Sequence, residues 1–150
     1  MTILVFDIET IPDTQAGRTL YNLEGLSDKD TAEAMFALRR AKSGNDFLPH
    51  YLQKICAISI VLSQGNSLKV WSLGDESASE QELIKRFFAG IDKHTPTLVS
   101  WNGCGFDLPV YITAPYFTKL APQPIGRWGK INKISNGITT LVATTIVIST

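Results

Sequence analysis

Two acidic residues, Asp7 and Glu9, stand two positions apart at the end of the apolar run that begins this 150-residue chain. Side chains alternate between the two faces of a β-strand, so a strand over residues 3–7 that continues through Glu9 places both carboxylates on one face. Carboxylates held side by side repel each other, and a divalent cation between them removes that cost. The spacing therefore predicts a cation site at the end of a buried strand.

A third acid, Asp107, follows a second apolar run, Thr97–Trp101, and a turn that contains Gly103 and Gly105. Glycine lets a turn bring two stretches of backbone close together because it has no Cβ. Three acids at the ends of two strands are the pattern of a phosphoryl-transfer site that uses two metal ions. We therefore treat the two segments as the two halves of one candidate site.

The composition fits one globular domain. The chain is 44% hydrophobic and 19% charged, enough to build a core. It shows no leader pattern, and its apolar runs are far shorter than the roughly 18 residues of a membrane helix. Its two cysteines, Cys56 and Cys104, lack metal-ligand spacing, and Cys56 is expected to be a buried thiol. We expect a cytoplasmic protein without a membrane segment.

Charge is distributed unevenly along the chain. Residues 1–107 carry all 14 acidic residues and ten basic ones, a net charge of −4, whereas the last 43 residues have four basic residues and no acid. Nonspecific binding of nucleic acid depends on neutralising phosphates, so an acidic body argues against strong binding of that kind. Metal ions held by the acids would offset part of this charge.

Sequence patterns predict an α/β fold with a central mixed sheet flanked by helices. Alternating or apolar runs indicate strands, and the segment 64–67 between two of them has the composition of a hairpin turn. Capping residues and apolar positions three and four apart indicate helices. The expected strands are 3–7, 55–63, 68–73 and 97–101, and the expected helices are 28–42, 80–93 and one that begins near Asp107.

The two acidic segments resemble those of a known enzyme family. Asp7-Ile8-Glu9-Thr10 resembles the first motif of the DEDD 3′–5′ exonucleases, and Asn102–Pro109 resembles the second motif in the exonuclease domains of family B DNA polymerases. The longer segments Phe6–Asp13, Phe47–Pro49 and Leu98–Gly103 are similar to a family of stand-alone bacterial exonucleases related to those domains. The resemblance covers residues 1 to about 110. It implies a ribonuclease H-like mixed β-sheet flanked by helices.

The resemblance also implies a mechanism. Asp7 and Glu9 would hold the metal ion that activates water, and Asp107 would help to hold a second ion ~4 Å away, both being Mg²⁺ or Mn²⁺. Thr10, Asn102 and Phe106 would contact the 3′-terminal nucleotide, Phe106 by offering a stacking face. The implied substrate is single-stranded or 3′-terminal nucleic acid, with DNA favoured over RNA.

Simpler structural roles are open for several of these residues. Asp107 could cap the helix that follows it, and capping is compatible with metal binding. Trp101 is expected in the core, and Phe106 could lie there instead of contacting a base. Exposed roles at a turn, loop or helix end are expected for Asp13, His50 and His94.

The chain departs from the family after its second motif. Exonucleases of this type need a fourth acid in a Tyr-x-x-x-Asp segment on a later helix, and no Asp or Glu follows Asp107. From Tyr111 onward the sequence is rich in threonine and has no helical period. We therefore expect two parts: 1–110, the N-terminal part of an exonuclease domain, and 111–150, an atypical tail. A reading-frame change near position 110 would explain the tail and would leave the fold incomplete at its C-terminus.

Three functions follow from these observations. The first is a metal-dependent 3′–5′ exonuclease, and the second is a non-catalytic remnant that binds metal or nucleic acid, because losing one acid weakens a metal site. The third is a phosphoesterase for small substrates, which would use the same acids but would not require Asn102 or Phe106.

Overall fold

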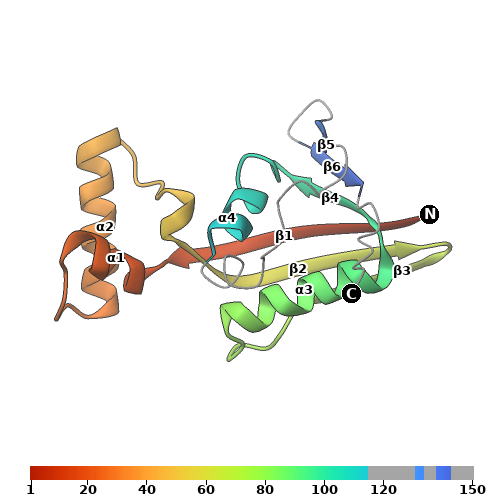
Figure 1. The fold of residues 1–150 in the computed structure, drawn as a ribbon, viewed down its shortest axis with the longest axis horizontal. Coiled ribbons are helices and arrows are strands. Elements are labelled where there is room, and N and C mark those ends of the chain that lie inside the picture. Colours follow the sequence, from red (N-terminus) through yellow and green to blue (C-terminus); the bar gives the residue numbers. More distant parts are fainter. Residues whose placement is uncertain (115–130, 134–137, 143–150) are drawn as a thin grey trace, which may run out of the picture.

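The computed structural model describes residues 1–114, 131–133 and 138–142, the last two segments by their backbone alone (Figure 1). The described strands form one mixed sheet in the order β3-β2-β1-β4-β6-β5, with helices beside it. The predicted α/β class is therefore confirmed. In chain order the elements are β1 (Thr2–Pro12), α1 (Thr14–Tyr21), α2 (Asp28–Ser43), the 3₁₀ turn η1 (His50–Leu52), β2 (Gln53–Gln64), β3 (Ser67–Ser72), α3 (Glu80–His94), β4 (Thr97–Trp101), α4 (Asp107–Thr113), β5 (Ile131–Lys133) and β6 (Ile138–Val142).

Strand β1 lies at the centre of the sheet. It pairs with β2 in antiparallel fashion along its whole length, which carries it well beyond the predicted range 3–7. Its parallel pairing with β4 covers only Ile3–Val5. Strands β2 and β3 form the predicted hairpin, and Gly65 in its turn has a φ of 58°, which favours glycine. Pairing with β2 thus supports the end of β1 that carries Asp7 and Glu9, whereas the pairing with β4 does not reach that end.

The main core lies on one face of this sheet. Alternate residues of β1 and β2 point into it, and α3 and α4 cover them. The ring of Phe87 on α3 packs 4.9 Å from Phe6 and stacks on Tyr111 of α4 at 4.8 Å. Burying one such side chain contributes about 1.5–3 kcal/mol. The buried residues of these four elements include Leu4, Phe6, Ile8, Ile58, Ile60, Leu62, Leu83, Ile84, Phe87, Val110 and Tyr111.

Helices α2 and α3 form close to the predicted ranges 28–42 and 80–93, and a serine caps each of them. The Ser27 hydroxyl accepts a hydrogen bond from the Asp30 N–H at 3.1 Å, and the Ser79 hydroxyl accepts one from the Glu82 N–H at 3.2 Å. Gly44 ends α2 in the left-handed conformation. These bonds satisfy N–H groups that a helix leaves unpaired at its start.

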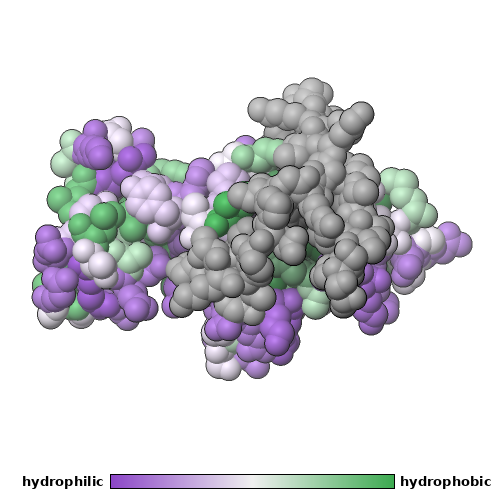
Figure 2. Space-filling view, viewed as in Figure 1, coloured by the Kyte–Doolittle hydropathy of each residue, from purple (hydrophilic) through white to green (hydrophobic). Residues whose placement is uncertain are grey.

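A second, smaller core joins α1 and α2 at one end of the molecule (Figure 1). Helix α1 was not predicted. Asp13 caps it, since its carboxylate accepts from the Ala16 N–H at 3.0 Å, so Asp13 caps a helix and not merely a turn. Gly17 of α1 lies against Met35 of α2, where a Cβ would collide with the methionine sulfur. Figure 2 shows hydrophilic side chains over the outer surfaces of this unit and of α3.

Two expectations about single side chains are wrong. Trp101 is 66% exposed because it alternates with buried Leu98 and Ser100 and so lies on the open face of the sheet. Cys56 is exposed because it is the unpaired residue of the bulge where the β1–β2 register shifts. His50 and His94 stand at helix ends, as expected, and both are half-buried; the ring of His50 lies 5.9 Å from that of Phe106.

Within the described part of the chain, no helix is long and apolar enough to cross a bilayer. Most of the atypical tail expected at 111–150 falls in segments 115–130, 134–137 and 143–150, which lie outside the described residues. The tail begins inside α4, where Tyr111 is buried. The division of the chain at position 110 stays a prediction.

Candidate active site

Asp7 and Glu9 lie on β1, on either side of buried Ile8, and both are exposed. The alternation along this strand places Phe6 and Ile8 in the core and the two acids on the opposite, open face. The expectation that the two carboxylates share one face therefore agrees with the strand geometry.

Asp107 reaches the same part of β1 from the other direction. Strand β4 stops pairing with β1 at Val5, and beyond that point none of the described strands lies beside this edge of β1. Asp107, the first residue of α4, lies near this part of β1, close enough to the backbone N–H of Ile8 for that group to favour the ionised carboxylate. The N-cap residue of α4 is Phe106, which makes no side-chain cap, so the alternative role of Asp107 as the N-cap is wrong.

A tight turn between β4 and α4 positions Asp107. Asn102 has a φ of 54°, and its carbonyl accepts from the N–H groups of Gly105 at 2.8 Å and Phe106 at 2.9 Å. The Gly103 carbonyl accepts from the Leu108 N–H at 2.8 Å. A Cβ on Gly105 would collide with the side-chain amide of Asn102. The expected role of glycine in a close backbone turn thus has a physical basis at position 105.

Asp107 is only 2% exposed, and the burial of its carboxyl group is the main reason that the pKa of this group rises to about 6. Its own backbone N–H lowers the pKa, the negative charge of Asp7 raises it, and the N–H of Ile8 lowers it. One oxygen, Oδ1, has no hydrogen-bond partner among the described residues. An acid that is buried, near another acid and incompletely bonded suits a site that receives a cation.

Tyr111 lies one helical turn beyond Asp107 and was not singled out from the sequence. Burial, and secondarily the charge of Asp107, raise the pKa of its phenol well above the ordinary value, so it remains neutral. Its hydroxyl has no partner within the described ranges. The spacing of four residues from Asp107 on a helix is the signal that could have indicated it.

An aromatic surface lies beside Asp107, around its chain neighbour Phe106. Phe106 is half-buried, with its ring 5.6 Å from Phe47 and 5.9 Å from His50. Phe47 is 57% exposed, so it offers a ring face to solvent beside α4. Phe106 therefore both packs against the core and takes part in a surface cluster, and Phe47 and His50 are members that the sequence did not indicate. Thr10 lies at the β-bulge, where its hydroxyl donates to the Gln53 side-chain oxygen at 2.9 Å.

The three predicted metal ligands are only partly gathered. Asp7 and Asp107 are close enough for the charge of one to affect the pKa of the other. Among the residues that the structure describes, no group of three His, Cys, Asp or Glu side chains could hold a metal ion. The arrangement thus brings two of the acids together, and the complete set of Asp7, Glu9 and Asp107 stays a prediction.

Residues 45–120, just over half of the chain, match the model of a family described as predicted 3′–5′ exonucleases related to the exonuclease domain of PolB. The matched segment contains Asn102, Phe106 and Asp107 and does not reach the first acidic pair. The chain belongs to this family, and its mixed sheet with flanking helices is consistent with a ribonuclease H-like exonuclease fold. No curated protein and no solved structure matches this chain.

Proposed function

We propose that this protein is a metal-dependent 3′–5′ exonuclease that hydrolyses the terminal phosphodiester bond of a nucleic acid. The observation that carries the proposal is Asp107, which lies on the segment that matches an exonuclease family. Its carboxyl group is buried, the charge of Asp7 affects its pKa, and one of its oxygens has no partner among the residues that the structure describes. Oxygen ligands of this kind are those that Mg²⁺ and Mn²⁺ prefer.

In this proposal Asp7, Glu9 and Asp107 hold the metal ions, which when bound supply an activated water and stabilise the attacking and leaving oxygens. Asp107 lies beside the Ile8 N–H, which favours its ionised form, and its Oδ1 would be available to a cation because it has no hydrogen-bond partner among the described residues. Glu9 must turn toward Asp7 for the three carboxylates to act together. The exposed position of Glu9 on a strand leaves its side chain free to do so.

The substrate end of the site would be formed by the β4–α4 turn and the aromatic surface. Asn102 and Thr10 would orient the terminal sugar, and Phe106 with Phe47 would offer ring faces to the terminal base. We propose single-stranded or 3′-terminal DNA as the preferred substrate over RNA, and a cytoplasmic location. The preference for DNA and the cytoplasmic location do not depend on the metal assignment. Competition between DNA and RNA tests the first, and cell fractionation tests the second.

The test is release of mononucleotides from a 3′-labelled single strand by the purified chain with Mn²⁺ or Mg²⁺. We expect activity that EDTA abolishes, that Asp7→Ala removes and that Asp92→Ala, a change of an exposed acid on α3, leaves intact. Equal activity of the Asp7→Ala variant would refute the proposal. A small phosphodiester that is hydrolysed without competition from single-stranded DNA would indicate a small-molecule phosphoesterase instead.

A second candidate is a non-catalytic remnant that binds metal or nucleic acid. It is favoured by residues 108–150, which contain no Asp or Glu that could serve as the fourth carboxylate of the family pattern. For a remnant, Mn²⁺ would raise the thermal stability through Asp7 and Asp107 without any hydrolysis. Sequencing the gene across codons 105–155 and reading all frames decides between the two candidates. A frame change followed by a codon for a fourth acid would favour the exonuclease, and a confirmed frame without one would favour the remnant.

A further inference from the structure

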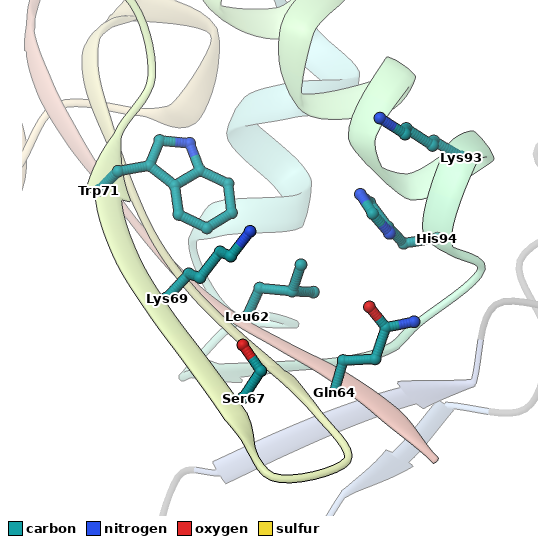
Figure 3. A pocket seen from close by; sticks show the side chains of 7 residues that line it. All are labelled: Leu62, Gln64, Ser67, Lys69, Trp71, Lys93 and His94. Carbon is teal, nitrogen blue, oxygen red and sulfur yellow. The ribbon is translucent and has the colours of Figure 1, made fainter.

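A hollow of about 340 Å³ lies between the β2–β3 hairpin and the C-terminal end of α3 (Figure 3). Lys69 and Trp71 stand on β3 directly opposite Leu62 and Ile60, so both lie on the face that α3 covers. Figure 3 shows these two side chains projecting into the space in front of Lys93 and His94 of α3. We call this space, which Leu62, Gln64 and Ser67 complete, the hairpin–α3 pocket.

The hairpin–α3 pocket gathers basic side chains in an acidic part of the chain. Residues 1–107 carry a net charge of −4, yet Lys69, Lys93 and His94 line this pocket and no acidic residue does. Within the described residues, none of these three takes part in an ion pair or side-chain hydrogen bond. The positive charges of Lys69 and Lys93 are therefore available to a ligand.

Local reasons explain each basic residue separately but not their convergence. Lys93 and His94 lie in the last turn of α3, where positive charge favours a helix. Lys69 lies on the edge strand, where a lysine discourages pairing with another chain. Neither reason requires all three to face one hollow that also contains an indole ring. Trp71 is 40% exposed, so part of its face is open to that hollow.

We propose that the hairpin–α3 pocket is a second binding site, which holds one nucleotide of a single-stranded nucleic acid. The base stacks on Trp71, as bases do on exposed aromatic rings in proteins that bind single strands. The phosphate lies between the ammonium groups of Lys69 and Lys93, and Gln64 and Ser67 supply polar contacts. The volume falls in the usual range for small-ligand sites.

This site is separate from the carboxylates. The pocket lies on the face of the sheet that α3 covers, whereas Asp7 and Glu9 lie on the opposite face. Along β2, Gln64 at the far end of the pocket is five positions, about 17 Å, from Ser59, which pairs with Asp7. The choice of nucleic acid as the ligand rests on the proposed function. Binding in this pocket needs no metal, however, and a measurement in EDTA tests it independently of hydrolysis.

The experiment measures the affinity of the full chain for a fluorescein-labelled oligothymidylate by anisotropy in EDTA. We expect Lys69→Glu with Lys93→Glu to weaken binding at least tenfold and to reduce the salt slope by about 0.7 for the phosphate contact that is lost. The matched control, Lys29→Glu with Lys85→Glu, reverses two exposed charges outside the pocket and should change affinity much less. An equal loss in the control would overturn the proposal.

Stacking and ligand identity are tested in the same assay. We expect Trp71→Ala to weaken binding about tenfold with an unchanged salt slope, and Trp71→Phe, which keeps a ring, to restore most of it. Unchanged affinity of Trp71→Ala would refute the stacking role. Competition by dTMP or by an acidic peptide as strong as that of the oligomer would overturn the assignment to a strand. Loss of hydrolysis with these results intact would count against the proposed exonuclease and not against this site.

Discussion

Replacing Asp107 by asparagine should stabilise the metal-free protein at neutral pH. Burial raises the pKa of Asp107 from 3.8 to about 6, so its ionised form is less favourable in the folded chain than in the unfolded chain. A difference of about two pKa units corresponds to about 3 kcal/mol of lost stability. Asparagine has nearly the same shape and carries no charge, so Asp107→Asn removes this cost.

The direction of the pKa shift determines the pH range in which Asp107 costs stability. Because the folded pKa is raised, the cost is fully present above about pH 6 and disappears as the pH falls toward 3.8. The free energy of unfolding of the Asp107→Asn variant should therefore exceed that of the wild type by up to about 3 kcal/mol at pH 8, and the difference should vanish near pH 4. At this chain length that corresponds to a rise in Tm of roughly 6–12 °C.

Thermal and urea unfolding in EDTA, repeated across this pH range, measure the effect. Asp92→Asn, the same change at an exposed acid on α3, serves as the control and should shift Tm little. With saturating Mn²⁺ the wild type should become more stable than Asp107→Asn, because a metal ion that binds through Asp107 stabilises the folded wild type and not the variant. A variant no more stable than the wild type at pH 8, or equally stabilised at pH 4, would refute the reasoning from burial.

Three further substitutions test the packing around the site and the scaffold. Gly105→Ala should cost about 1–3 kcal/mol of stability and displace Asn102, which a lower Tm and weaker oligonucleotide binding would reveal. Gly17→Ala should cost a similar amount by urea unfolding, despite the better helix propensity of alanine, because its Cβ meets Met35; a stabilised variant would contradict the contact. Glu80→Ala should cost about 1–3 kcal/mol, since it leaves a buried β2 N–H without its acceptor at 2.7 Å, and Glu80→Gln should cost clearly less.

The sequence predicted those elements whose signals are local. Helices α2 and α3 each begin at a serine that caps them, and the β2–β3 hairpin has a turn segment between two strand-forming runs. Helix α1 has eight residues and includes Gly17, so its stability depends on packing against Met35 of another helix. That contact is not local and no pattern within the segment indicates it.

The candidate site was predictable to the same extent. The alternation of Asp7, Ile8 and Glu9 gave a common face for the two acids, because the period of a strand is fixed. The position of Asp107 beside Ile8 depends on where β4 stops pairing with β1, a feature of the whole sheet. Trp101 was misplaced because apolar character alone does not say which face of a strand is buried.

The Ile8 N–H beside Asp107 has a consequence for how the protein tolerates change. This group belongs to the peptide backbone, and every residue except proline supplies it, so its effect on the pKa of Asp107 does not depend on which side chain occupies position 8. An apolar replacement of Ile8 can therefore alter the packing of the core without removing this N–H. Proline at position 8 would remove the N–H and would raise the pKa of Asp107 further.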